Sequence, residues 1–223
     1  MPIIRCAANK LTADEIKSLQ EENIPTGYEL YEAFDPTKRI IAKYIIGILL
    51  AFFTLFLILF INSFIRPEFN GYEYGATYLS LDLVNKLLIL FILILLALAT
   101  TVVHEALHGL VYYYFTRKRP QFGCRGGNPY AALAFKTYLN KNMAALAAIT
   151  PLAISSLIMI LWQMLSIELL PYFIAVVTIN VGLSTADIAS VSYFLLKPKD
   201  VLIGFDGYSG AVYKPIRPLS FHR

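Results

Sequence analysis

Two histidines and a glutamate occur in this sequence at the spacing of a zinc site. They form His104-Glu105-Ala106-Leu107-His108, an HExxH motif. Residues four positions apart lie on one face of an α-helix, so both imidazoles can reach the same metal ion. Zn²⁺ binds imidazole nitrogen, and Glu105 is placed to accept a proton from water that the ion activates. The motif therefore predicts zinc-dependent hydrolysis, with His104 and His108 as metal ligands and Glu105 as the general base.

The motif interrupts an apolar segment, and this context favours a functional role. The chain has three histidines, and two of them belong to the motif. Ionisable side chains inside a membrane-spanning helix are costly and generally serve a function. The competing interpretation is structural, with the histidine pair hydrogen-bonded to a neighbouring helix. We expect the metal site.

A third ligand has to come from elsewhere in the chain. Glu105 and Asp187 are the acidic residues well inside apolar segments, whereas Glu168 lies in a short connection and His222 in the C-terminal tail. At about 1.5 Å per residue, the two motif histidines lie roughly 20 and 14 Å from the basic end of their helix, and Asp187 lies roughly 15 Å from the basic end of its own. These matching depths predict Asp187 as the third zinc ligand.

The helix that contains Asp187 also carries a polar stripe. Asn180, Ser184 and Asp187 are spaced i, i+4, i+7 and share one helix face. We expect Asn180 to be catalytic, because its amide could hold the substrate carbonyl or an oxyanion near the metal. Ser184, and Thr100 and Thr101 before the motif, are equally well explained by packing contacts between neighbouring helices.

The composition predicts a membrane protein. Hydrophobic residues make up 57% of the 223 residues and charged ones 15%, which is too little charge to cover a soluble domain of this length. The apolar residues form runs close to or above the roughly 20 residues that cross a bilayer. We expect an all-α polytopic fold, one integral membrane domain over residues 1–223. Its four transmembrane helices are predicted at about 40–65, 87–115, 143–167 and 169–196.

The basic residues predict the orientation of these spans. Seventeen of the 19 Lys and Arg lie before or at the start of the first span, between the second and third spans, or in the tail, and only Arg66 and Lys86 lie between the first two spans. The positive-inside rule then places both termini, segments 1–39 and 197–223, in the cytoplasm of a multi-pass protein of the bacterial plasma membrane. We interpret the net charge of +4 as topology and lipid contact, and expect no nucleic-acid binding.

The connecting segments predict small elements only. Thr12–Glu15 resembles a capping box that opens a short helix. Tyr130–Leu139 is a candidate strand or short surface helix, and Asp206-Gly207 suggests a hairpin in the tail. Cys6 and Cys124 are 118 positions apart and form no CxxC pair, which favours free thiols over a redox pair.

An HExxH motif in one span with a distal aspartate in a later span resembles the site-2 protease class of intramembrane zinc metalloproteases. More closely, the arrangement resembles the zincin peptidases grouped as DUF3267, which are small four-span proteins. The segments that carry this resemblance are His104–Gly109, Phe122-Gly123, Thr150-Pro151, Asn180–Ile188 and Lys197–Asp200. The resemblance implies zinc ligands His104, His108 and Asp187, with Glu105 as general base. In contrast to the site-2 proteases, no Pro lies between the Asn and the Asp, no Gly follows the Asp, and there is no PDZ or CBS module.

We therefore expect a zinc-dependent metalloprotease that acts on membrane proteins or peptides at or within the lipid bilayer, where Tyr130–Leu139 pairs with an extended substrate. The alternative is a non-proteolytic zinc-binding scaffold, a regulatory subunit or a metal transporter, although four helices with two intramembrane acids offer few groups for a transport path. A zincin with glutamate as third ligand is disfavoured, because Glu168 lies on the opposite side of the membrane.

Overall fold

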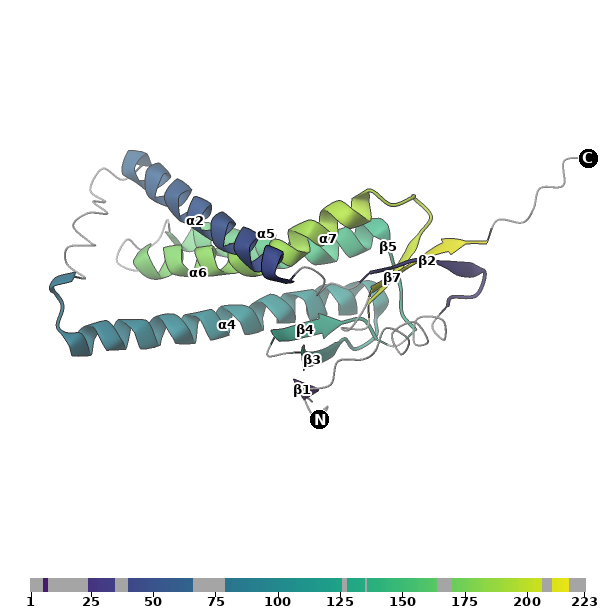
Figure 1. Cartoon of the computed structure of the whole chain (residues 1–223), viewed down its shortest axis with the longest axis horizontal. Helices are drawn as coiled ribbons and strands as arrows, with labels where there is room; N and C mark the ends of the chain where they lie inside the picture. Colours follow the sequence, from purple (N-terminus) through teal and green to yellow (C-terminus); the bar gives the residue numbers. More distant parts are fainter. Residues whose placement is uncertain are drawn as a thin grey trace, which may run out of the picture. The chain divides into compact units, whose positions relative to one another are not determined.

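A computed structural model describes residues 6–7, 24–34, 40–65, 79–125, 128–134, 136–163, 170–205 and 210–216. The elements are labelled in Figure 1. The short helix predicted at Thr12, the turn at Asp206-Gly207, and the residues Glu168 and His222 lie outside the described residues.

Long apolar helices form most of the described chain. They are α2 (Ile40–Ile65), α4 (Leu83–Thr116), α5 (Lys141–Gln163), α6 (Leu170–Leu183) and α7 (Thr185–Leu195). Each predicted span coincides with helix, but the fourth one is divided into α6 and α7, which are bent by 44° relative to each other. Large apolar side chains such as Val84, Leu98 and Val102 are exposed along α4. Such a surface suits lipid, in which the backbone polar groups of a helix are already satisfied.

The break between α6 and α7 lies at two hydroxyl residues, Ser184 and Thr185, and contains no proline. Both the Ser184 amide and its hydroxyl donate to the Asn180 carbonyl, at 3.0 and 2.8 Å. The Thr185 hydroxyl donates to the Gly182 carbonyl at 2.8 Å. Such side-chain bonds to the preceding turn compete with the helical ladder and bend helices. The next helix therefore starts afresh at Thr185, and Asp187 lies in its first turn.

By length and composition, α4 and the Lys141–Ile158 part of α5 can each cross a membrane, and α6 with α7 forms a third span if the bent pair counts as one. The apolar stretch found in α2, Ile45–Ile61, is shorter than these spans. Within the described residues, two or three helices are thus long and apolar enough to span a bilayer. The prediction of four spans with cytoplasmic termini stays a prediction.

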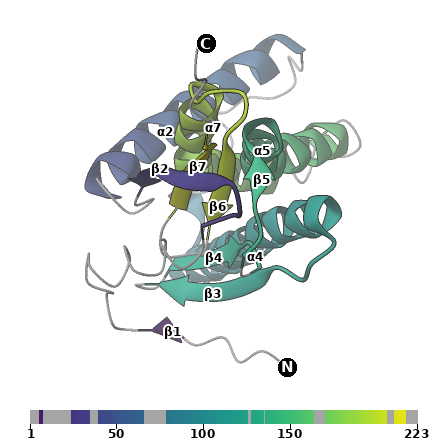
Figure 2. The ribbon, with the colours of Figure 1, turned by 90° about the vertical axis from the view of Figure 1, so that its right-hand side faces the viewer.

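Two β-sheets show that the all-α expectation was wrong. The smaller sheet has the order β1-β3-β4, formed by Cys6–Ala7, Gln121–Arg125 and Asn128–Ala132; β1 and β3 are parallel, β3 and β4 antiparallel. The larger is antiparallel with the order β2-β7-β6-β5, formed by Tyr28–Phe34, Gly210–Pro215, Leu202–Phe205 and Leu139–Asn140. Figure 2 shows β2, β7 and β6 side by side. The hairpin predicted in the tail is confirmed as β6 and β7, and Tyr130 lies in a strand as one of its two predicted alternatives.

The chain divides into two compact units. The first contains residues 1–39, 105–151 and 186–223, and with them both sheets. Its core joins the start of α5 to the larger sheet; the buried residues of this core include Leu133, Ala147, Phe194, Ile203 and Val212. Burial of such side chains contributes roughly 1.5–3 kcal/mol each for the larger ones.

The second unit is helical and contains residues 40–104 and 152–185. Within it, α2 packs on α6. This approach requires Gly47, because a Cβ at that position would lie 2.9 Å from the Thr185 hydroxyl oxygen and 3.0 Å from the Gly182 carbonyl oxygen. Small residues at contacts between helices allow close backbone packing in membranes.

A lysine at the start of α5 holds the end of α7. The Lys141 ammonium donates to the carbonyls of Leu195 and Lys197, at 3.2 and 2.7 Å, and so satisfies acceptors that a helix end leaves unpaired. Lys197 in turn forms an ion pair with Glu32 of β2 and lies 4.0 Å from the centre of the Tyr193 ring. The hydrogen bond from Lys197 lowers the pKa of the Glu32 carboxyl below its usual value. These contacts fasten α7, the helix that carries Asp187, to α5 and to the larger sheet.

Candidate metal centre

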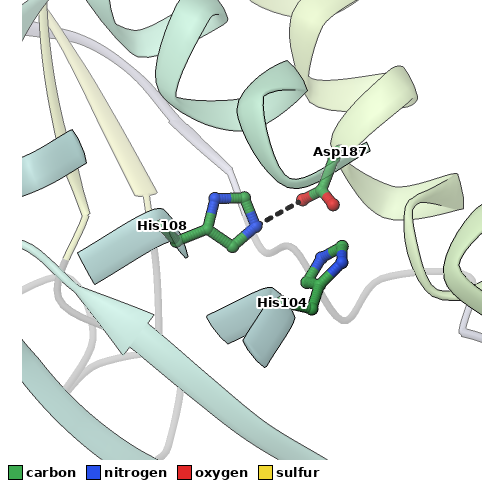
Figure 3. Close-up of side chains that lie close together, drawn as sticks. All are labelled: His104, His108 and Asp187. Atoms are coloured by element: carbon green, nitrogen blue, oxygen red, sulfur yellow. Dashed lines mark ion pairs between the residues drawn. The ribbon is translucent and has the colours of Figure 1, made fainter. Parts of the chain in front are cut away.

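The structure brings His104, His108 and Asp187 together (Figure 3). The two histidines project from successive turns of α4, and the aspartate comes from the first turn of α7. One imidazole nitrogen from each histidine and one carboxylate oxygen all lie within 4.8 Å of one another. His104 and His108 are buried and Asp187 is partly buried. Two nitrogens and one oxygen in such a group could hold a metal ion, and three protein ligands are the number found in catalytic zinc sites.

The hydrogen bonds of His108 determine which nitrogen faces the aspartate. Its Nδ1 lies 2.9 Å from the carbonyl oxygen of Ala147, which can only accept, so Nδ1 carries a proton. Its Nε2 lies 3.3 Å from Asp187 Oδ1. In the neutral imidazole, the lone pair of His108 Nε2 would therefore face a lone pair of Asp187 Oδ1. A cation, either a proton or a metal ion, relieves this opposition, and the geometry fits a metal ligand whose other nitrogen is held by a carbonyl.

His104 is held in a similar way by Asn180. The Nδ1 of His104 lies 3.2 Å from the side-chain oxygen of Asn180, and both side chains are buried. Donation from Nδ1–H to this oxygen leaves the lone pair on Nε2, the tautomer that a metal ligand requires. Asn180 is 1% exposed, and its Nδ2 has no hydrogen-bond partner among the described residues. Its amide hydrogens are donors that a bound group could use.

Glu105 is held by the smaller sheet. Its Oε2 accepts a 2.7 Å hydrogen bond from the backbone N–H of Ala131 in β4. Ala131 is 3% exposed, and its N–H points away from the partner strand β3. No sequence pattern marks this contact, because the donor is a backbone group and any residue except proline could supply it.

Two further residues shape the surroundings of the histidines. The Tyr112 ring, one turn after His108, stacks on that imidazole with 6.2 Å between ring centres. Gly109 allows the Phe122 ring of β3 to lie against α4, because a Cβ at that position would be 2.3 Å from the end of the ring. Gly109 and Phe122 belong to segments that carry the family resemblance, whereas Tyr112 was not singled out in the sequence.

The hydroxyl residues near the motif have structural roles. Thr100 and Thr101 donate to the carbonyls of Leu96 and Ala97, one turn earlier in the same helix. Ser184 donates to the Asn180 carbonyl at the break before α7. These hydroxyls bond to the backbone one turn earlier, and none of these bonds is the contact between neighbouring helices that the sequence suggested.

A comparison with models of protein families finds one match. The DUF3267 family model, described as "Putative zincin peptidase", matches residues 97–202. This segment contains the HExxH motif, Asn180 and Asp187, and the match confirms the resemblance to the DUF3267 family that was drawn from the sequence. No curated protein and no solved structure matches the chain.

The donor set leads to a prediction for metal content. We expect the full-length protein, purified in detergent, to bind about one zinc ion per chain, and His108→Ala or Asp187→Ala to weaken binding at least about tenfold, because either change leaves two protein ligands. Elemental analysis and competition with a chromophoric chelator measure both quantities. His222→Ala, which removes the remaining histidine of the chain, is the matched control and should leave binding intact. Equal zinc affinity in the wild type and both ligand variants would contradict the site.

Proposed function

We propose that this protein is a zinc-dependent metalloprotease that hydrolyses peptide bonds of membrane proteins at or within the bilayer. The observation that carries the proposal is the grouping of His104 and His108 of an HExxH motif with the distant Asp187, beside the carboxylate of Glu105. The description of the matching family as zincin peptidases supports the same reaction class.

His104, His108 and Asp187 would hold the zinc ion. Their fit to it rests on the Nδ1 partners of the two histidines, which direct the Nε2 lone pairs, and on the carboxylate opposite His108. Zinc, when bound, supplies a Lewis acid and lowers the pKa of water. The remaining work, which is proton transfer and orientation of the peptide, falls to side chains and backbone groups of this chain.

Glu105 would be the general base. Its carboxylate takes a proton from the attacking water and returns it to the amine that leaves. Before a substrate binds, the hydrogen bond from Ala131 N–H restrains one oxygen, Oε2.

Asn180 would have two functions. Its side-chain oxygen accepts from His104 and positions that ligand. Its Nδ2, buried and without a partner among the described residues, would donate to the carbonyl oxygen of the peptide as negative charge develops there. This agrees with the catalytic role that the sequence predicted and adds the positioning of His104.

The substrate would bind as an extended strand along β4. A peptide bond in a transmembrane helix is already hydrogen-bonded, so the substrate must unwind before it is cleaved, and pairing with a strand edge replaces the lost backbone bonds. The outward edge of β4 is the edge that contacts Glu105 through Ala131, so a strand there would lie beside the predicted base.

The exposed apolar surface of α4 and the distribution of basic residues support a position in the membrane with both termini in the cytoplasm. We further propose four spans, with α2 as the first and α6 with α7 together as the fourth. The lipid bilayer and a membrane-protein substrate are then the partners of the protein.

Replacing the predicted base separates a protease from a metal-binding scaffold. We expect Glu105→Gln to keep its zinc and to lose cleavage by at least about 100-fold, because the amide can still accept from Ala131 but cannot take a proton. Quantitative comparison of new protein N-termini in native membranes that contain either form measures the loss. The exposed Glu29→Gln is the control and should match the wild type. Identical cleavage products with Glu105→Gln would favour a scaffold or transporter.

Two substitutions distinguish the functions of Asn180. Asn180→Asp keeps an oxygen acceptor for His104 but removes the amide donor, so we expect retained zinc and a kcat about 10²–10³ lower. Asn180→Ala also removes the acceptor, so zinc affinity should fall by a further 10–100-fold or so. Zinc titration and turnover of a reconstituted substrate provide the two measurements. Thr101→Val, a polar change in the turn before the motif, should affect neither. Full turnover by Asn180→Asp would exclude the donor role.

The strand hypothesis is tested at Ala131. Because its N–H points away from β3, Ala131→Pro keeps the bonds of the β3–β4 pair and removes the outward donor that contacts Glu105. An effect on strand pairing should therefore appear in KM, whereas the lost restraint on Glu105 should appear in kcat. We expect KM for a transmembrane substrate to rise about tenfold, the typical effect of losing one well-aligned backbone hydrogen bond, with zinc content unchanged. Ala131→Gly, which keeps the backbone N–H, is the control and should leave KM unchanged. Unchanged kinetics in Ala131→Pro would rule out pairing at this edge.

A further inference from the structure

The two cysteines of the chain meet in the smaller sheet. Strand β1 pairs with β3 in parallel, and the register places Cys6 opposite Cys124 and Ala7 opposite Arg125. These are the only cysteines in the sequence, and the pairing joins positions 118 residues apart. The sequence suggested two separate free thiols, because 118 positions lie between them. The strand register shows that the two residues occupy opposite positions in neighbouring strands.

The register brings the two residues to the separation that a disulfide requires. Neighbouring strands lie about 4.8 Å apart. The Cα atoms of a disulfide are usually about 4.4–6.8 Å apart. Residues directly opposite each other in a β-pair fall within this range, whereas a shift of one residue would move a side chain to the other face of the sheet. Cys124 is a free thiol and is partly buried in the structure.

From this register we propose that Cys6 and Cys124 form a reversible disulfide, a redox site separate from the candidate metal centre. The oxidant is a small-molecule disulfide such as oxidised glutathione. One cysteine thiolate attacks it, which forms a mixed disulfide and releases one glutathione; the second cysteine thiolate then attacks the protein sulfur and releases another. Two thiols are thus oxidised, one disulfide is reduced to two thiols, and the two protons leave with the glutathione molecules.

The position of the bond indicates what it would control. Cys124 lies in β3, the strand that pairs with β4, and β4 holds Glu105 through the Ala131 N–H. The disulfide would tie β1 covalently to this hairpin. Disulfides in reducing compartments are usually transient and regulatory, which fits a bond that closes and opens with the thiol balance.

The test uses the full-length protein in detergent or nanodiscs, equilibrated with mixtures of reduced and oxidised glutathione and then alkylated with N-ethylmaleimide. We expect the oxidised wild type to take up no N-ethylmaleimide at either cysteine. Its mass should be about 2 Da below that of the reduced, unalkylated protein, the mass of the two hydrogens removed on disulfide formation. Digestion without reductant should yield the Cys6 peptide joined to the Cys124 peptide, and excess dithiothreitol should restore both thiols. Two glutathione adducts without an internal bond, or bonds between chains only, would overturn the proposal.

Two kinds of variant provide controls. Cys6→Ser and Cys124→Ser should each take up one glutathione and form no internal bond. The double variant Cys6→Ser/Ala7→Cys keeps two cysteines and moves one out of register by a single residue, so the yield of the internal disulfide should fall at least about tenfold. An equal yield in this variant would show that the β1–β3 register is not what brings the cysteines together, and would refute the proposal. None of these results depends on proteolytic activity, so the redox site and the proposed function can fail separately.

Discussion

Everything at the candidate metal centre depends on one constraint, which is that two imidazoles on the same helix must turn the same kind of nitrogen toward one carboxylate. Groups other than the three candidate ligands meet this constraint. A backbone carbonyl of α5 takes the Nδ1 proton of His108, and the side chain of Asn180 on α6 faces Nδ1 of His104. If either acceptor were lost, the imidazole could rotate or change its tautomer, and a buried donor would be left unsatisfied at a cost of about 1–3 kcal/mol. Residues that never touch the ion therefore define the site as much as the three that could.

The break before α7 meets a second requirement, namely that a carboxylate must be stable in apolar surroundings. A continuous helix would put Asp187 in mid-helix, where the backbone offers no unpaired N–H. At the break, Ser184 and Thr185 donate to the preceding turn, and Asp187 belongs to the first turn of a new helix, where the positive end of the helix dipole favours negative charge. Proline commonly produces such breaks. This Asn-to-Asp segment contains no proline, and its carboxylate still lies at the start of a helix.

The sequence predicted the features that depend on residues close together in the chain better than those that join distant segments. HExxH fixes its own geometry, because an i, i+4 pair needs only one helical turn, and Asp187 could be found because depth in a membrane can be counted from the basic residues that mark its edge. The pairing of Tyr28–Phe34 with Gly210–Pro215 was not predicted. It joins the two ends of the chain, and a short strand rich in Tyr and Glu has no apolar periodicity to reveal it. The contacts of Ala131 with Glu105 and of Ala147 with His108 could not be predicted for a different reason. They use the backbone N–H and the backbone carbonyl, which do not depend on the residue type.

The backbone donors along β4 show how closely the sheet and the predicted base are linked. On the edge that points away from β3, Pro129 has no N–H, the Ala131 N–H is bound to Glu105, and the Leu133 N–H donates to the Phe205 carbonyl at 3.0 Å. An arriving strand would therefore find carbonyl acceptors here but no N–H donor that is not already engaged. It can gain one only by taking the Ala131 N–H from Glu105, and that exchange would release the carboxylate at the moment when a peptide reaches the edge. Under the proposed function, Glu105 would be restrained until a peptide reaches this edge, and that behaviour would depend on Pro129 and Ala131 of β4 and on Leu133 directly after it.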